Sequence, residues 1–524
     1  MNEVADLLVL GAGIAGCSAA LHAADLGASV VLVAKDELGG SNTAWAQGGI
    51  IGLAPPEEGD SPDLLASDIE AAGAGLCRSE AVRQLAEEGP RLCRSFLWER
   101  LGVPFDLGAN GTPDPTAEAA HSARRIYHAK DATGLAIQTA LSEAVRKHPN
   151  IQVRERLCLV DLITSPHHCV SPVRVYEPIR VHGAYLYDSA QGAVEGLLAR
   201  RTLLATGGLG YLYLHTTNPP SATGDGLAAA YRASARIVNC EYLQFHPTTL
   251  YVPGKPRTLL TEALRGEGAQ LLNRKGERFM GKYAPEQMEL APRDVVSRAI
   301  FQEMAASGEP CAYLDLAPVA AKLDLDEHFP TVMAACRAEG IDPNRHPIPV
   351  VPAAHYFCGG VLVDLEGRTS LPGLFAAGEV ACTGLHGANR LASTSLLEGL
   401  VWGFHSAAAA VRELRETVDP DPGDLASWRM PEGPEDTDPL LIDQDWGLIR
   451  STLWNYAGIV RTGARLERAK ADLHYLAHRI ERFYHEASLS RELLELRSGI
   501  LCARLILNAA LQNPESRGCH YRVD

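Results

Sequence analysis

The sequence predicts an α/β protein with a Rossmann-like domain, an inserted α+β domain and a C-terminal three-helix bundle. Three observations predict this fold. An apolar run at residues 7–10 leads into a G-x-G-x-x-G motif, the pattern changes between about 236 and 350, and helical apolar spacing recurs after 445. With 524 residues the chain is too long for one ordinary core, so two to four domains are expected.

The three glycines of the motif follow the first predicted strand at the spacing of a dinucleotide-binding turn. Gly11 allows the tight turn, Gly13 lets the backbone approach a pyrophosphate, and Gly16 lets helix and strand pack closely. A lone glycine triplet also marks ordinary turns, but here a helix follows at 17–26 and a second strand at 28–33. Phosphates would lie at the helix N-terminus, where free N–H groups and the dipole favour anions. The residues predicted to line this turn are Gly11, Ala12, Gly13, Ile14, Ala15 and Gly16.

Residues 7–24 carry no formally charged side chain, and their number is near the length that crosses a bilayer. The glycines interrupt this run, and Glu3 and Asp6 make its flank acidic where a signal peptide would be basic. We therefore expect a soluble, cytoplasmic protein without a membrane segment.

The composition argues against some classes of function. A net charge of −16 argues against general nucleic-acid binding, although an acidic surface also simply keeps soluble proteins apart. Twelve cysteines include no C-x-x-C pair, so neither a metal site nor an iron–sulfur cluster is predicted. Most of these cysteines are expected to be reduced core residues.

A polar and glycine-rich loop follows the second strand. A fold that reads ribose hydroxyls should present Asp or Glu after this strand, but the chain has Lys35, which cannot accept a hydroxyl proton. Ordinary NAD recognition is therefore not predicted. The loop at residues 39–49 has hydrogen-bonding side chains at one end and glycines at the other; alone, it could be an ordinary surface loop.

This loop resembles the flavin-contacting loop of the succinate dehydrogenase/fumarate reductase flavoproteins and of the L-aspartate oxidases. The resemblance implies FAD as the cofactor. In the respiratory members a His in an S-H-T triplet carries covalent FAD, whereas this chain has Asn42, which has no imidazole to alkylate, so we expect non-covalent FAD. The other residues expected at the cofactor in this part of the chain are Lys35, Thr43, Ala44, Trp45, Ala46, Gln47, Gly48 and Gly49.

A dense polar run at residues 118–126 contains one carboxylate, one imidazole and two guanidinium groups. Alone, a solvated charged loop would be the simpler interpretation. The run resembles the E-G-G-H-S-x-R-R segment of the L-aspartate oxidases, which implies that Glu118 lies beside the substrate ammonium. Ala119 and Ala120 replace two glycines of that segment, and alanine would be strained if a positive φ is needed there.

The resemblance covers nearly the whole chain and is weakest between about 155 and 200. It implies an FAD-binding domain at 1–235 and 351–414, a capping domain at 236–350, a linker at 415–444 and a helical domain at 445–524. Asp225 opens a predicted helix and could be a simple N-cap, but its position in the family lies at the cofactor.

Substrate-facing residues are implied for the capping domain. Each His or Arg there would singly be a structural hydrogen-bonder, but together they resemble the family's capping domain in the same order. Pro292 suits a first helical turn, which would place Arg293 near a helix start. The implied residues are His246, Thr261, Glu262 and Arg293.

The second part of the FAD-binding domain supplies the remaining candidates. Glu379 ends a predicted strand and offers the ribose-binding carboxylate that is missing after the second strand. The run at 385–398 is the most specific in the chain; by resemblance, Arg390 and His355 bind a carboxylate. The backbone of Ser395 and Leu396 would meet the isoalloxazine at a helix N-terminus.

These residues suit a small dicarboxylate bearing an amine. Arg390 with His355 and His246 with Thr261 would bind the two carboxylates, since arginine binds carboxylates through two parallel hydrogen bonds. Glu118 would face nothing favourable in succinate or fumarate, so it favours oxidation of L-aspartate to iminoaspartate. The resemblance implies reoxidation by oxygen or fumarate, and use of iminoaspartate by quinolinate synthase for NAD synthesis.

Two other functions stay open at this point. One is a soluble fumarate reductase or succinate-oxidising flavoprotein; the other uses FAD structurally in a binding or RNA-modification protein. The role of Arg293 is also open. The family assigns proton transfer to this arginine, yet a guanidinium is essentially never deprotonated, so a relay through Glu262 is the alternative.

Overall fold

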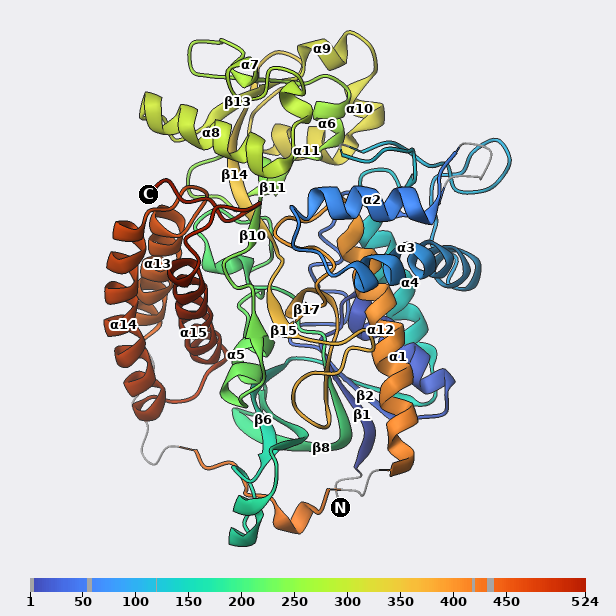
Figure 1. The fold of residues 1–524 in the computed structure, drawn as a ribbon, viewed down its shortest axis with the longest axis vertical. Coiled ribbons are helices and arrows are strands. Elements are labelled where there is room, and N and C mark those ends of the chain that lie inside the picture. The colour runs from blue at the N-terminus through green and yellow to red at the C-terminus, as the bar shows by residue number, and fades with distance from the viewer. Residues whose placement is uncertain (1–3, 54–58, 119, 417–419, 431–437) are drawn as a thin grey trace.

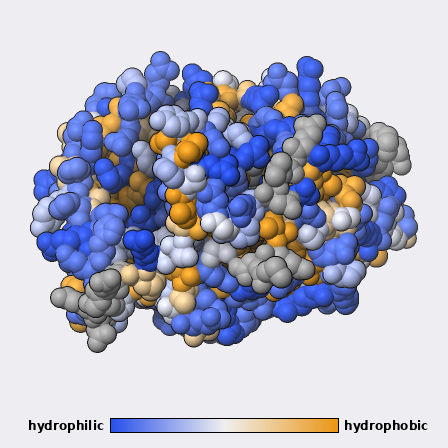
Figure 2. Space-filling model, turned by 90° about the horizontal axis from the view of Figure 1, so that it is seen from below, coloured by the Kyte–Doolittle hydropathy of each residue, from blue (hydrophilic) through white to orange (hydrophobic). Residues whose placement is uncertain are grey.

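The computed structural model describes residues 4–53, 59–118, 120–416, 420–430 and 438–524. A mixed central sheet occupies the lower half of Figure 1, a smaller unit with its own sheet lies above it, and three long helices lie along one side. The described residues contain no helix that is long and apolar enough to cross a membrane. On the face seen from below, apolar side chains occur in separate groups among hydrophilic ones (Figure 2).

The central sheet has seven strands, and its main path combines a parallel and an antiparallel part. β1 pairs in parallel with β2 and β8, so Leu8 lies opposite both Val31 and Thr202. β8 changes partners along its length, because residues 193–198 pair with β7 and residues 199–204 pair with β1. In spatial order the strands are β5 (Ile151–Arg154), β2 (Val30–Val33), β1 (Ala5–Leu10), β8 (Ala193–Leu204), β7 (Arg180–Asp188) and β6 (Leu157–Ser165), with β16 (Leu374–Ala376) beside β8.

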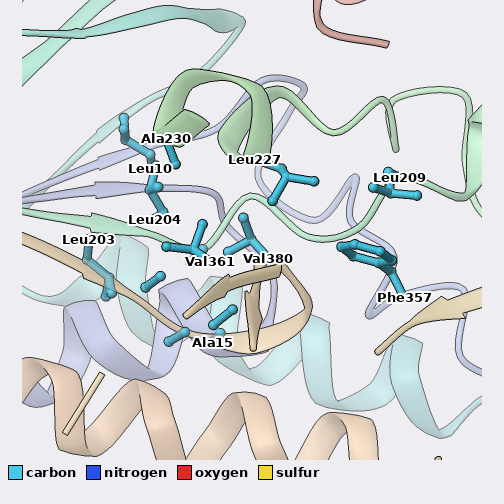
Figure 3. Close-up of a cluster of buried hydrophobic side chains, with 14 of the residues drawn as sticks. Leu10, Ala15, Leu203, Leu204, Leu209, Leu227, Ala230, Phe357, Val361 and Val380 are labelled. Carbon is cyan, nitrogen blue, oxygen red and sulfur yellow. The ribbon is translucent and has the colours of Figure 1, made fainter. Parts of the chain in front are cut away.

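Helices cover both faces of the parallel part. α1 (Ile14–Asp25) packs on α12 (Thr394–Glu413) at close range, since a Cβ added to Gly403 would lie 2.7 Å from the Ala15 oxygen. On the other face, Ala230 of α5 (Asp225–Arg232) lies near Leu10 and Leu204, and Leu227 lies farther along the same buried core, toward Leu209 (Figure 3).

Further helices and short strands complete this part of the fold. The remaining helices are α2 (Pro62–Ala72), α3 (Ser79–Leu92), the π-helical continuation η2 (Cys93–Arg100) and α4 (Thr133–Lys147). The short strands are β3 (Ile50–Ile51), β4 (Ile126–Tyr127), β9 (Ile237–Val238), β15 (Gly360–Leu362) and β17 (Ala381–Cys382). β9 lies inside the range predicted for the capping domain, but it pairs with β15, which lies outside that range.

Asp131 lies directly before the N-cap of α4 and connects this helix to the upper unit. The N-cap is Ala132, without a side-chain hydrogen bond. The Asp131 carboxylate instead accepts hydrogen bonds from the backbone N–H and the hydroxyl of Thr331, both at 2.7 Å. Asp131 therefore links the start of α4 to α11 (Pro330–Ala338) of the upper unit.

The upper unit has its own hydrophobic cluster, which extends from Leu250 to Val350. Its antiparallel sheet has the order β11 (Thr258–Leu259), β10 (Leu243–Leu250), β14 (Ile348–Phe357), β13 (Ala312–Asp315) and β12 (Gln270–Leu272). Its other helices are α6 (Ala263–Gly266), α7 (Met280–Tyr283), α8 (Arg293–Ser307), α9 (Ala317–Ala320) and α10 (Leu325–His328). β10 and β14 run from this unit toward the central sheet (Figure 1).

The C-terminal helices α13 (Pro439–Tyr456), α14 (Gly463–Glu486) and α15 (Arg491–Gln512) pack together as a bundle. α13 begins inside the predicted linker because Asp438 accepts a hydrogen bond from the Leu440 N–H. Another part of that linker is ordered against the β6–β7 hairpin, where the Tyr185 hydroxyl donates to the Ala426 oxygen at 2.7 Å. Linker residues 417–419 and 431–437 lie outside the described residues.

Candidate active site

A single pocket brings together residues from the glycine turn, the 39–49 loop, the upper unit and the start of α12. Of the predicted site residues, those that line it are Gly11, Ala12, Gly13, Ile14, Ala15, Lys35, Asn42, Thr43, Trp45, Ala46, Gln47, Gly48, Gly49, Glu118, His246, Thr261, Glu262, Arg293, His355, Glu379, Arg390, Ser395 and Leu396. Gly16, Ala44 and Asp225 do not line the pocket.

The glycine turn forms a cradle at the N-terminus of α1. Gly11 has φ +115°, and an added Cβ would lie 2.1 Å from the Ala205 oxygen. Gly16 lies behind the turn, where an added Cβ would lie 1.9 Å from the Gly11 oxygen; this close packing explains why Gly16 is outside the pocket. Gly13, Ile14 and Ala15 at the start of α1 line the pocket, and the Ile14 N–H donates to the Thr43 hydroxyl at 3.0 Å. The helix N-terminus at the pocket suits an anionic group.

Asp225 does not line the pocket, and the reason involves Lys35. The Lys35 ammonium lies 2.6 Å from Asp225 and 2.9 Å from Glu495, and it also donates to the Ser221 oxygen at 2.6 Å. Burial opposes the charge of Lys35, but the two carboxylates outweigh it and raise the Lys35 pKa. The positive charge of Lys35 is therefore balanced inside the protein, and Asp225 is its counterion.

Glu379 lies between two parts of the pocket wall. Its carboxylate accepts a hydrogen bond from the Phe357 N–H at 2.9 Å and one from the Asn42 side chain at 3.4 Å. Burial raises the pKa of Glu379 to about 7, in spite of these hydrogen bonds. The carboxylate is thus held in place but is costly to ionise until a further donor, such as a ribose hydroxyl, reaches it.

The raised pKa of Glu379 predicts a pH-dependent stability. Since the folded pKa of about 7 lies above the ordinary glutamate value of 4.5, the FAD-free protein should lose stability as pH rises from about 4.5 to about 7. The loss should reach up to about 3 kcal/mol, and Glu379→Gln should remove it. Urea unfolding of both proteins at pH 5 and pH 8 measures this difference; identical pH dependence in the two would contradict the assignment.

Glu118 is held by a residue that the sequence analysis did not single out. The Ser393 hydroxyl donates to the Glu118 carboxylate at 2.6 Å, and the His121 ring nitrogen Nε2 lies 3.1 Å from the Ala392 oxygen. Ser393 has φ +57°, a left-handed conformation that non-glycine residues seldom adopt. Ala120 also has a positive φ, +64°, so the strain expected for alanine in the glycine position is present. Ala119 lies outside the described residues.

Arg390 is a buried cation with no carboxylate partner among the described residues. Its Nη1 donates to the Leu391 oxygen and the Ser395 hydroxyl, both at 3.3 Å, and its guanidinium lies 4.7 Å from the centre of the Tyr356 ring. Burial, together with repulsion from Arg293, lowers its pKa to about 10. It stays charged at neutral pH, and its guanidinium is therefore suited to bind a ligand carboxylate.

A second buried charge system lies in the upper unit. Arg293 is the first residue of α8 and donates from Nε to the Glu262 carboxylate at 2.6 Å. Arg265, which is fully buried, lies 3.4 Å from the same carboxylate. Burial raises the cost of ionising Glu262, but the two arginines outweigh it and lower the Glu262 pKa to about 2. Glu262 is therefore a carboxylate at neutral pH that holds Arg293 at the pocket wall.

The two predicted histidines lie side by side, with ring centres 5.2 Å apart. His355 Nδ1 is 2.8 Å from the Thr217 hydroxyl, and His246 Nδ1 is 3.0 Å from the Thr248 oxygen. Burial, with repulsion from the pocket arginines, lowers the pKa of both histidines well below 6.5. Both histidines are therefore neutral hydrogen-bonding groups, as is the Thr261 hydroxyl. The positive charge in this part of the pocket wall comes from Arg293 and Arg390.

Sequence reasoning missed residues that connect the predicted ones. Gln244 donates to the Arg390 backbone oxygen at 2.8 Å and accepts from Arg293 at 3.4 Å. Its place two residues before His246 on β10 was the available signal, because alternate residues of a strand share a face. No local signal pairs Ser393, Thr217 and Tyr356 with their partners, since each contact joins segments that are far apart in the chain.

Comparison with known proteins agrees with this geometry. Residues 6–396 match a family described as "FAD binding domain", and residues 448–524 match "Fumarate reductase flavoprotein C-term". L-aspartate oxidase 1 of Ralstonia nicotianae is 44% identical over 522 residues, which cover 99% of this chain and 95% of that protein. The chain belongs to the L-aspartate oxidase family. The L-aspartate oxidase of Pseudomonas aeruginosa is 43% identical over 526 residues, covering 99% of this chain and 95% of its own length.

Solved structures show the same fold in the wider superfamily. A variant of FrdA from E. coli quinol fumarate reductase has a TM-score of 0.88 at 28% identity, covering 100% of this chain and 92% of that chain. A quinol-fumarate reductase with menaquinol molecules has a TM-score of 0.87, again at 28% identity, covering 100% and 93%. The predicted fold class is confirmed: a Rossmann-like FAD-binding domain, an inserted capping domain and a C-terminal helical bundle.

FAD is the cofactor of this chain. The residues present fit the group, because the glycine turn at the N-terminus of α1 lines the pocket and Glu379 offers an acceptor carboxylate in the same pocket. Among the described residues, no group of three or more His, Cys, Asp or Glu side chains could hold a metal ion.

Proposed function

We propose that this protein oxidises L-aspartate to iminoaspartate, with oxygen or fumarate as the electron acceptor. The observation that carries the proposal is the Glu118 carboxylate, held by Ser393 in the same pocket as Arg390, His355 and Arg293. Family membership supports the same reaction. The chemistry that bound FAD supplies is the acceptance of a hydride from the substrate Cα.

Each end of aspartate has a partner in this arrangement. Arg390, with His355 beside it, binds one carboxylate, and His246 with Thr261 binds the other. Glu118 accepts hydrogen bonds from the ammonium group, which fixes which face of Cα is presented. Because Arg390 has no internal counterion among the described residues, its guanidinium can pair with a substrate carboxylate, while the neutral histidines serve as hydrogen-bonding groups.

Arg293 and Glu262 are proposed to transfer the proton that the substrate loses together with the hydride. Arg293 lies at the pocket wall, and its Nε is 2.6 Å from Glu262, which also contacts Arg265. Since the pKa of Glu262 is about 2, this carboxylate does not retain a proton at neutral pH. Its proposed role is to orient Arg293 and to accept the Nε proton of Arg293 while Arg293 takes up the proton that leaves the substrate.

A soluble fumarate reductase is the second candidate, and the structural similarity to fumarate reductases favours it. Glu118 counts against it, because neither succinate nor fumarate has an amine, and Asn42 replaces the flavin-linking His of the respiratory relatives. A purely structural use of FAD would leave the complete set of dicarboxylate-binding residues without a purpose.

Product analysis tests the proposed reaction. Iminoaspartate hydrolyses in water, so each aspartate consumed should give one oxaloacetate and one ammonium, with one hydrogen peroxide in air or one succinate from fumarate. Aspartate consumption without ammonium release would refute the proposal. We also propose a cytoplasmic location and a hand-over of iminoaspartate to quinolinate synthase, because a product that hydrolyses benefits from rapid use.

The FAD is proposed to be non-covalent. Asn42 contacts Glu379 and Asn218 at 3.4 and 3.5 Å and has no nucleophilic ring nitrogen. Acid precipitation of the purified protein should release all the yellow colour into the supernatant. Fluorescent flavin that stays with the precipitated chain would show a covalent bond instead.

A further inference from the structure

We propose that the C-terminal turn, residues 517–521, is a positioning element for the two arginines of the substrate site. This turn follows α15 and contacts both the segment that carries Arg390 and the helix that begins with Arg293. The proposal rests on the proposed function only in its kinetic part, since dicarboxylate binding can be measured separately.

The first contact is with residues 388–389, directly before Arg390. The Cys519 N–H donates to the Ala388 oxygen at 2.9 Å, and the Cys519 thiol lies 3.2 Å from the Asn389 side-chain oxygen. Gly518 has φ +51°, and an added Cβ would lie 2.5 Å from the Ala388 oxygen. The turn therefore touches the Arg390 segment so closely that only glycine fits.

The second contact is with α8 of the upper unit. Arg298 donates to the Gly518 oxygen at 3.3 Å, and its guanidinium lies 4.9 Å from the centre of the Tyr521 ring. Arg298 also forms an ion pair, at 2.8 Å, with Asp294, which is the residue that follows Arg293. One short turn of chain thus contacts the supports of both arginines.

Gln244 joins the same two supports inside the protein. Its amide donates to the Asn389 side-chain oxygen and to the Arg390 oxygen, both at 2.8 Å, and its carbonyl accepts from Arg293 at 3.4 Å. The Asn389 side-chain oxygen therefore accepts hydrogen bonds from both the Gln244 amide and the Cys519 thiol. A displacement of the C-terminal turn would be passed to Asn389 and so to both arginines.

The turn is anchored firmly in the helical domain. Arg461 is fully buried and donates to His520 Nδ1 at 2.6 Å and to the Glu241 oxygen at 2.8 Å. Burial and the adjacent Arg461 lower the His520 pKa to about 4, so the ring is neutral and can accept this hydrogen bond. His520 Nε2 lies 2.9 Å from the Asn513 oxygen at the end of α15.

Gly518→Ala tests the proposal, with Gly308→Ala as a matched control. Gly308 has φ +70° at the C-terminus of α8, but an added Cβ would meet nothing within 4 Å. Both variants carry the backbone penalty of alanine at positive φ, but only Gly518→Ala pushes on the Ala388 oxygen. We expect Gly518→Ala holoenzyme to bind succinate at least tenfold more weakly by flavin absorbance titration, with kcat/KM for aspartate reduced by a similar factor. Gly308→Ala should leave both values unchanged.

Equal succinate affinity in the two glycine variants would overturn the proposal. If Gly518→Ala does not fold with FAD, the variants Cys519→Ala and Cys519→Ser test the role of the turn instead, since neither substitution adds bulk. Cys519→Ala should weaken succinate binding, and Cys519→Ser, which keeps a donor toward Asn389, should restore it; equal binding by Ala, Ser and the parent would refute the role of the turn. Failure of the parent enzyme to oxidise aspartate would refute the proposed function and leave the succinate result standing.

Discussion

Arg293→Leu should abolish reduction of the bound flavin by aspartate. Arg293 lies at the pocket wall and pairs with Glu262, so it is placed to act on the substrate proton, whereas Arg390 has no carboxylate partner among the described residues and is free to bind a ligand. A group used only in the transition state lowers kcat and kcat/KM together, and loss of a proton-transfer group costs about 10²–10⁴-fold in rate. Stopped-flow reduction under anaerobic conditions measures this directly.

Two further variants separate chemistry from binding at this position. Arg293→Lys should also fail, since lysine lacks the planar fork that contacts Glu262 and has a different reach. Arg293→Leu should keep its FAD, and succinate should still perturb the flavin spectrum, whereas Arg390→Leu should weaken succinate binding itself. A near-normal kcat with a raised KM in Arg293→Leu would make Arg293 a second carboxylate clamp, and Glu262 would then be the first candidate for the proton.

Glu118→Gln should reduce aspartate oxidation by at least about tenfold, because a charge-assisted hydrogen bond worth about 1.5–3 kcal/mol becomes a neutral one. Fumarate reduction by the reduced enzyme should survive, since fumarate offers no amine. Ser393→Gly should shift aspartate oxidation in the same direction but less, because glycine suits the φ of +57° and removes only the hydroxyl that holds Glu118. Steady-state assays with both substrates measure the split, and an equal loss of both activities would show that Glu118 does not read the ammonium.

The fold was largely predictable because its signals are local. The glycine turn, the apolar first strand and the proline before Arg293 each act within a few residues, and Arg293 is indeed the first residue of α8. The same holds for the three C-terminal helices, of which α13 begins at Pro439 because the Asp438 side chain accepts a hydrogen bond from the Leu440 N–H.

The missing parts of the site depend on contacts between distant segments. Lys35 and Asp225 are 190 positions apart, and Ser393 and Glu118 are 275 apart, so no spacing rule pairs them. Burial decides these cases: a charged Lys35 inside the protein needs a counterion, and the nearest acid in space is Asp225. Gln244 lies two residues before the predicted His246, but its link between Arg293 and Arg390 exists only once β10 lies beside the 389–390 segment.

Anaerobic mixing of the purified holoenzyme with L-aspartate, succinate or buffer, while the visible flavin band is followed, tests the proposed substrate directly. We expect rapid bleaching by L-aspartate and no comparable bleaching by succinate or buffer, because Glu118 and Arg390, which line one pocket, are proposed to bind the ammonium and a carboxylate of the substrate. Bleaching by succinate with an unchanged band in L-aspartate would refute L-aspartate as the substrate and identify a succinate-oxidising flavoprotein.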